Sequence, residues 1–131
     1  MRRCKDCQRY DALCSNAKKV RRDGSSHTVG FTREDFLAWC RERPRRCVYC
    51  ELPDELIYDL DLRTQVGHRL ETLGIDRLDN TRSYELDNIA FCCFPCNKVK
   101  GNVFTSEEML SGIGAAVGAV WRARSASRSA A

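Results

Sequence analysis

Two Cys-x-x-Cys pairs frame the middle of this chain: Cys47-Val48-Tyr49-Cys50 and Cys93-Phe94-Pro95-Cys96. A two-residue spacer lets both thiolates of a pair bind one ion through a tight turn, and two such pairs complete a tetrahedral zinc site with bonds of about 2.3 Å. We therefore predict one structural zinc ion bound by these four cysteines, joining the ends of the 42-residue segment between the pairs. Four buried thiols without a metal, or a redox-active dithiol, are the alternatives. Cys92 is out of register with the pairs and is left out of the site.

The composition bounds the kind of protein. The chain has 131 residues, which suits one domain, and its 43% hydrophobic and 31% charged residues are typical of globular proteins rather than disordered ones. No apolar stretch is long enough to span a membrane, and no apolar run follows the basic residues at the start, so no secretory signal is expected. The nine cysteines are therefore read as thiols and metal ligands, not as a disulfide framework, in a cytoplasmic protein.

The charges are distributed unevenly along the sequence. Residues 1–50 carry 13 basic and six acidic side chains, residues 51–90 carry four and ten, and residues 91–131 carry five and two. A basic arm and a basic end on either side of an acidic middle suggest a polyanion held at its flanks, with a carboxylate-rich centre that binds a cation. Ordinary solvated charge on helix surfaces is the alternative.

The pattern of apolar residues predicts helices at both ends of the chain. Apolar residues recur every three or four positions over 7–20, and Thr32 opens a second helix with a capping box, Phe31 being placed to contact Phe36. A capping box at Thr105 opens a last helix that we expect to end near residue 121, followed by a disordered basic tail.

The middle of the chain predicts two short strands and a helix. Residues 70–78 and 88–91 read as strands, and Pro95 and Gly101 mark the start and end of a helix. The expected fold is α+β, with a basic helical arm over 1–46, a core over 47–104, a helix over 105–121 and a tail over 122–131.

A third pair, Cys4 and Cys7, leaves a second metal site open. Its potential further ligands are Cys14, His27 and Cys40. Cys7 and Cys14 also lie on the apolar stripe of the first helix, where cysteine packs as a small hydrophobic residue.

The segment between the zinc pairs resembles the HNH endonucleases, in particular the zinc-ribbon branch of this ββα-metal family. The likeness lies in Leu73-Gly74-Ile75-Asp76-Arg77-Leu78-Asp79-Asn80, in Ser83-Tyr84-Glu85-Leu86-Asp87-Asn88-Ile89, and in Cys93-Phe94-Pro95-Cys96-Asn97-Lys98-Val99-Lys100-Gly101. It covers roughly 47–101, and more loosely the helical arm and the Thr105 capping box. The resemblance implies two strands and a helix that hold one divalent cation against a scissile phosphate.

The resemblance also implies the roles of single residues. Asp76 and Asn97 would bind the catalytic cation, Asn88 would tie the loop between the strands, and Lys100 would reach a phosphate. A carboxylate and an amide oxygen suit a hard cation such as Mg²⁺ or Mn²⁺, which would stabilise charge at the reacting phosphate. Asp79 is read as a loop cap, or else as a carboxylate that orients Arg77.

One residue departs from the family pattern, because Arg77 stands where the family has its general-base histidine. Arginine stays protonated and is no conventional base. Arg77 would bind the phosphate while another group or a metal-bound water supplies hydroxide; or His68, eight residues before Asp76, would act as the base; or the site is catalytically silent.

The sequence thus predicts an endonuclease that hydrolyses DNA phosphodiester bonds with one divalent cation, in a bacterial or phage-infected cell. Arg45, Arg46, Lys98 and Lys100 are the expected backbone contacts to DNA, which we expect to be duplex. The alternatives are a silent, zinc-stabilised nucleic-acid-binding module and a zinc-ribbon protein-interaction module. Sequence preference, nicking or double-strand cleavage, oligomeric state and biological role are left open.

Overall fold

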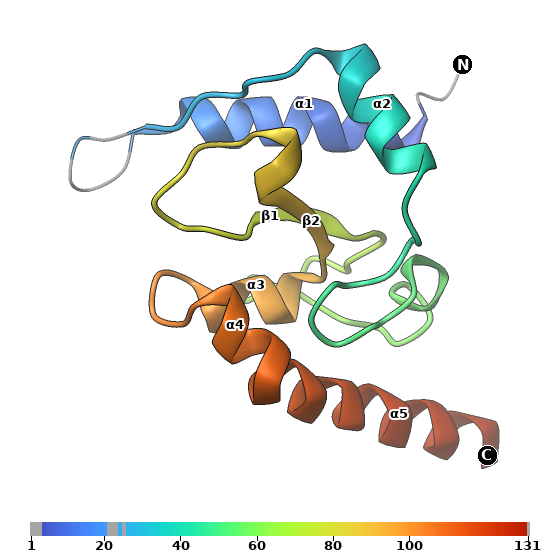
Figure 1. Ribbon diagram of the computed structural model, residues 1–131. Coiled ribbons are helices and arrows are strands. Elements are labelled where there is room, and N and C mark those ends of the chain that lie inside the picture. The colour runs from blue at the N-terminus through green and yellow to red at the C-terminus, as the bar shows by residue number, and fades with distance from the viewer. Residues whose placement is uncertain (1–3, 21–23, 25, 131) are drawn as a thin grey trace. The chain divides into compact units, whose positions relative to one another are not determined.

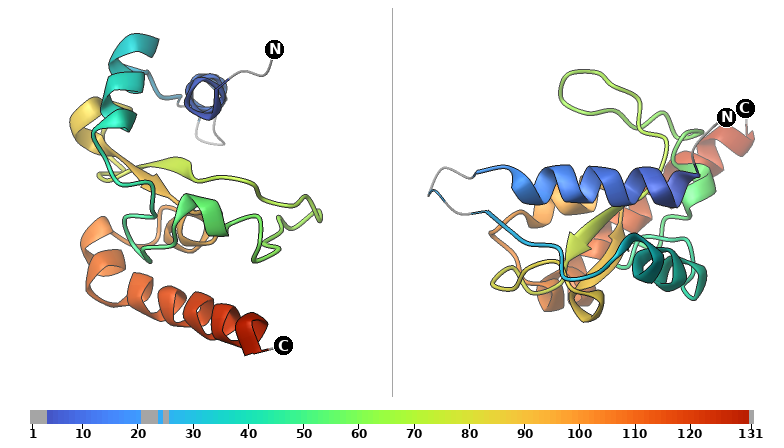
Figure 2. Two further views of the ribbon diagram at one scale, coloured as in Figure 1. Left: turned by 90° about the vertical axis from the view of Figure 1, so that its right-hand side faces the viewer. Right: turned by 90° about the horizontal axis from the view of Figure 1, so that it is seen from above.

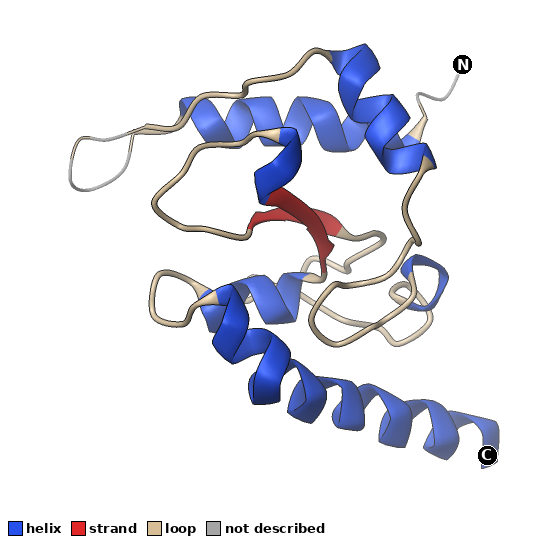
Figure 3. Cartoon of the chain, viewed as in Figure 1, coloured by secondary structure: helices blue, strands red, loops and turns tan. Residues whose placement is uncertain are grey.

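The computed structural model describes residues 4–20, 24 and 26–130, and confirms the α+β class (Figures 1 and 3). The elements in chain order are α1 (Lys5–Lys18), α2 (Arg33–Arg41), η1 (Asp54–Leu56), β1 (Gly74–Arg77), η2 (Leu86–Asn88), β2 (Ile89–Cys92), α3 (Phe94–Lys100), α4 (Ser106–Glu108), η3 (Met109–Ile113) and α5 (Gly114–Ala130). The segment η3 is a single π-helical stretch, and β1 and β2 pair in a two-stranded sheet. None of the helices in the described ranges is both long and apolar enough to cross a membrane.

The chain divides into two compact units. One unit holds the chain up to Pro44 together with Arg77–Ile89, and the other holds Arg45–Asp76 together with the chain from Ala90 onward. The chain passes between them within β1 and at the start of β2. The domain limits expected from the sequence remain a prediction.

In the first unit, α1 packs against α2 over aromatic residues (Figure 2). Thr32 and Asp35 form the predicted capping box, and the rings of Phe31 and Phe36 stack at 5.9 Å. Helix α1 begins and ends earlier than the predicted range of 7–20, because Cys4 provides the N-cap by accepting from the Cys7 backbone N–H. Val20 lies beyond the helix and is exposed, while Arg21 and Arg22 are outside the described residues.

In the second unit, two predicted helix boundaries are confirmed. Gly101 ends α3 with a φ of 45°, in the left-handed region that favours glycine, and the Thr105–Glu108 capping box opens α4. The expected end near residue 121 was wrong, because α5 continues to Ala130 through the segment expected to be a disordered tail. Its alanine and arginine residues are good helix formers, and Arg124 lies over the Trp121 ring at 5.1 Å, one helical turn away.

The strands are shorter than the sequence suggested. Strand β1 spans four residues, not the whole of 70–78, because the Thr72 hydroxyl and the Leu73 N–H both donate to the Asp54 carboxylate. Strand β2 begins at Ile89 after a 3₁₀ turn, and all four of its residues are buried. It leads directly into α3, which carries the second cysteine pair.

Candidate functional site

The two cysteine pairs converge as predicted. The Sγ atoms of Cys47, Cys50, Cys93 and Cys96 all lie within 4.8 Å of one another and are buried. The Cys50 and Cys93 sulfurs are 3.6 Å apart. A tetrahedral zinc ion with 2.3 Å bonds requires sulfurs about 3.8 Å apart, so the donor set fits zinc.

The backbone shapes the first pair into a tight turn. The Cys47 N–H donates to Leu52 and the Glu51 N–H donates back to Cys47, both at 2.9 Å, while Glu51 takes a positive φ of 65°. The Val48 N–H donates to the Phe91 carbonyl at 2.8 Å, which fixes the turn to β2. We call residues 47–52 the knuckle.

The closeness of the four sulfurs changes their protonation. Hydrogen bonds from Cys50, then from Cys92, lower the pKa of Cys47 far below its usual value. Hydrogen bonding to Cys47 raises the pKa of Cys93 and Cys96 far above theirs, because the packed sulfurs compete for protons. A divalent cation would allow all four to be thiolates together.

The other cysteines stay outside this cluster. The Cys92 thiol donates to the Cys93 carbonyl at 3.3 Å, and its pKa is raised by hydrogen bonding to Cys47 and then by burial. Within the described ranges, no second group of three or more metal-binding side chains converges. The second metal site left open at Cys4, Cys7, Cys14, His27 and Cys40 is therefore not assembled there.

The same unit contains a buried carboxylate, Asp76. The Tyr49 hydroxyl donates to Oδ2 of Asp76 at 2.7 Å, and Nζ of Lys100 lies 3.2 Å from the same oxygen. All three side chains are buried, and Lys100 is fully so. Among the described residues, Oδ1 of Asp76 has no hydrogen-bond or ion-pair partner. One carboxylate oxygen is thus held in place and the other is left for a ligand.

Tyr49 is the residue that the sequence reasoning missed. It lies inside the knuckle, 27 residues from Asp76, and only the fold brings the two together. Burial, and then its hydrogen bond to Asp76, raise the pKa of Tyr49 well above its usual value. The phenol is therefore neutral near pH 7 and acts as a donor that orients the carboxylate.

Helix α3 carries the other expected residues of this unit. Asn97 and Lys98 are exposed, directly after Cys96. Asn97 precedes Lys100 by three residues, a spacing that places the two side chains as neighbours on one helix face, with Cβ atoms about 5–6 Å apart. The phosphate contact predicted for Lys100 would require its ammonium to leave Asp76.

His68 lies in a separate loop of this unit. Its side chain is exposed, and its backbone pairs with Thr64 in a loop closed by the Leu70–Leu62 hydrogen bond. Within the described part of the chain, it makes no hydrogen bond or ion pair with Asp76.

Of the two arginines expected to contact DNA before the knuckle, Arg46 is exposed. Arg45 is half-buried, with its guanidinium 5.3 Å from the centre of the Phe91 ring.

The first unit holds Arg77 and Asn88 in a loop network. One guanidinium nitrogen of Arg77 donates to the carbonyls of Asn80 and Arg82, each at 2.8 Å, and the group lies 5.6 Å from the Tyr84 ring centre. Arg77 is buried, and its guanidinium is used at least in part to hydrogen-bond the loop carbonyls.

Asn88 joins the two ends of this loop. Its side-chain amide donates to the carbonyls of Asp79 and Ser83, and its oxygen accepts from the Asp79 N–H at 2.8 Å. The Asp79 carboxylate accepts from the Thr81 N–H and hydroxyl, which fits the loop-cap interpretation. The roles of Arg77 and Asn88 in catalysis remain predictions.

Comparison with known proteins gives one informative likeness. No family model matches the chain, and no curated protein matches it. The solved structure of PacI, described as a rare-cutting HNH restriction endonuclease that perturbs DNA, is 31% identical, with a TM-score of 0.79 over 95% of this chain and 84% of PacI. An identity of this size over nearly the whole length shows that the chain belongs to the HNH endonuclease family.

Proposed function

We propose that this protein is a metal-dependent endonuclease that hydrolyses DNA phosphodiester bonds with one divalent cation, supported by one structural zinc ion. The observation that carries the proposal is the buried Asp76 carboxylate, with Oδ2 held by Tyr49 and Lys100 and Oδ1 left for a cation. The likeness to a DNA-cutting HNH enzyme supports DNA as the substrate.

Two residues of this unit carry oxygen donors of the kind that a catalytic cation binds. Asp76 and Asn97 would hold it, and carboxylate and amide oxygens are the donors that Mg²⁺ and Mn²⁺ prefer. When bound, the cation would stabilise negative charge on the phosphate and on the leaving 3′ oxygen.

The chain's own groups prepare this site. Tyr49 orients the Asp76 carboxylate, and Lys100 offsets its charge within the protein. Asn88 and Arg77 hold the loop that follows β1. Because Arg77 cannot accept a proton, a group other than Arg77 must receive the proton from the attacking water.

The test is cleavage of supercoiled plasmid with Mg²⁺ and then Mn²⁺. Wild type should nick the plasmid, and Asp76→Asn should lower the rate by at least about 100-fold, because the cation loses its anionic ligand. Asp59→Asn is the matched control, since Asp59 is an exposed carboxylate, and it should cleave normally. Equal rates for Asp76→Asn and wild type would refute the proposal.

The second candidate is a catalytically silent nucleic-acid-binding module, which Arg77 favours. By the sequence resemblance Arg77 stands where the family has its base, and its guanidinium donates to the loop carbonyls of Asn80 and Arg82. A wild-type protein that binds DNA but stays inert with both metals would support this function instead.

A further inference from the structure

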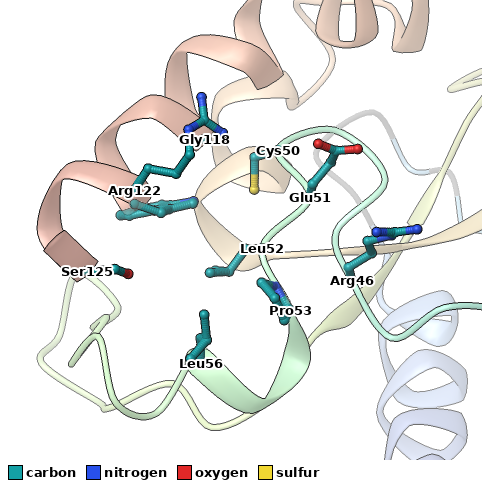
Figure 4. A pocket seen from close by; sticks show the side chains of 10 residues that line it. Arg46, Cys50, Glu51, Leu52, Pro53, Leu56, Gly118, Arg122 and Ser125 are labelled. Carbon is teal, nitrogen blue, oxygen red and sulfur yellow. The ribbon is translucent and has the colours of Figure 1, made fainter. Parts of the chain in front are cut away.

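The C-terminal helix approaches the knuckle closely enough that only glycine fits. A Cβ atom built on Gly114 would lie 2.2 Å from the Tyr49 carbonyl oxygen, and one on Gly118 would lie 2.8 Å from the Cys50 carbonyl oxygen. Figure 4 shows Cys50 and the segment after it running beside the part of α5 that carries Gly118 and Arg122. The two glycines therefore set the distance between α5 and the backbone of the knuckle.

Tyr49, whose carbonyl oxygen faces Gly114, is also the residue whose hydroxyl donates to Asp76. The Tyr49 backbone meets α5, while its hydroxyl donates to Asp76 at 2.7 Å. A tyrosine side chain has two rotatable bonds and its ring is buried, so a shift of its backbone is carried to the hydroxyl. Hydrogen bonds weaken beyond about 3.2 Å, and relief of the overlap at Gly114 requires a shift approaching an ångström.

We infer that Gly114 is a positioning residue for the cation site, and that α5 sets the Asp76 carboxylate through Tyr49. The inference rests on the proposed function in that it assigns the cation to Asp76. Gly118 acts four residues later on Cys50, so it affects the cysteine cluster rather than Asp76. The same helix thus supports two different sites through two glycines.

The experiment compares three glycine-to-alanine variants of the full chain. Gly112→Ala is the matched control, because a Cβ there meets nothing within 4 Å. Calorimetry measures the Kd for Mn²⁺ without DNA, and metal analysis measures zinc content. Near-ultraviolet circular dichroism, taken as the difference from Tyr49→Phe, reports the packing of the Tyr49 ring.

Gly114→Ala should raise the Kd for Mn²⁺ about 10-fold, the usual effect of losing a residue that orients a metal ligand, and should retain zinc. Its Tyr49 ring should lose part of its near-ultraviolet circular dichroism signal, because the phenol loses its fixed packing and its hydrogen bond to Asp76. Gly118→Ala should release zinc more readily to a chelator and keep its Mn²⁺ affinity. Gly112→Ala should behave as wild type.

A double-mutant cycle checks that the effect passes through Tyr49. In a Tyr49→Phe background, Gly114→Ala should have no further effect on the Kd for Mn²⁺; two fully additive effects would overturn the inference. Unfolded protein lowers the stoichiometry of binding rather than changing the Kd, so calorimetry distinguishes a loss of folding from a loss of Mn²⁺ affinity. Should Gly114→Ala not fold, Tyr49→Phe alone tests the link: an unchanged Mn²⁺ affinity in that variant would overturn the inference, because α5 is inferred to act on Asp76 through the Tyr49 hydroxyl.

Failure of the proposed nuclease function and failure of the inference about Gly114 give different results. A wild type that binds Mn²⁺ but does not cleave plasmid would refute the nuclease and leave the positioning role intact. A wild type without Mn²⁺ binding would remove the cation site, and the circular dichroism signal of the Tyr49 ring would still report the link between α5 and Tyr49. If Gly114→Ala changes neither that signal nor the Mn²⁺ affinity, the inference is overturned.

Discussion

One hydrogen bond, from Tyr49 to Asp76, connects the knuckle to the proposed cation site, and its loss has two predicted consequences. Tyr49→Phe should lower the cleavage rate about 10-fold or more, because Asp76 loses the donor that orients it. Stability should also change with pH. The pKa of Tyr49 is higher in the folded protein than in the unfolded chain, where it is near 10. The neutral phenol therefore stabilises the folded state fully below about pH 10, and this stabilisation is lost as the pH rises further.

Urea unfolding between pH 8 and 11 checks the second consequence. The free energy of unfolding of wild type should fall more steeply above about pH 10 than that of Tyr49→Phe. Parallel curves would mean that Tyr49 ionises as freely in the folded protein as in the unfolded chain.

Arg77 differs from the family at the base position, and its contacts predict loss of stability on substitution. Arg77→Met leaves the carbonyls of Asn80 and Arg82 without their donor, and should destabilise the protein by about 2–4 kcal/mol in urea unfolding. Arg82→Met is the control, because the Arg82 side chain is exposed and surface ion pairs contribute little to stability. A phosphate-binding Arg77 would instead lower DNA affinity at unchanged stability.

Helix ends that are fixed by residues close in sequence were predictable. Features that depend on contacts between residues distant in sequence were not. Thr32 and Thr105 form capping boxes with residues three positions away, so their helices begin where expected. The end of α5 has no such marker. The hydrogen bond between Tyr49 and Asp76 joins residues 27 apart, and no local pattern announces it. The four cysteines were predictable because their spacing alone specifies a tetrahedral metal site.

We expect the knuckle and the start of α3 to depend on a zinc ion bound between them. Cys93→Ser should reduce bound zinc from about one ion per chain to none, and α3 should lose its ordered start, because a structural zinc site contributes directly to folding. Metal analysis and circular dichroism before and after a chelator measure both effects. Cys14→Ser is the control, because Cys14 lies on α1 and is not part of the cluster, and it should retain zinc. A Cys93→Ser protein that folds fully without zinc would rule out the structural site.

The charge of the whole chain, basic at both ends and acidic in the middle, bears on how it would hold DNA. Binding through phosphates releases counterions, so affinity should fall steeply with salt, by a slope of about 0.9 per phosphate contact on a log–log plot. The exposed cations Arg46 and Lys98 are free to make such contacts at the surface, whereas Lys100 is buried against Asp76.

This difference predicts which substitutions change the salt dependence. Arg46→Gln and Lys98→Gln should each lower the slope by about one unit while leaving stability unchanged, because each removes one exposed phosphate contact. Lys100→Met should leave the slope unchanged and destabilise the protein, because it removes a buried partner of Asp76. Fluorescence anisotropy of labelled duplex DNA between 50 and about 200 mM salt gives the slopes. A loss of slope in Lys100→Met would show that the ammonium leaves Asp76 to bind a phosphate, so that DNA binding and release of the carboxylate are one event.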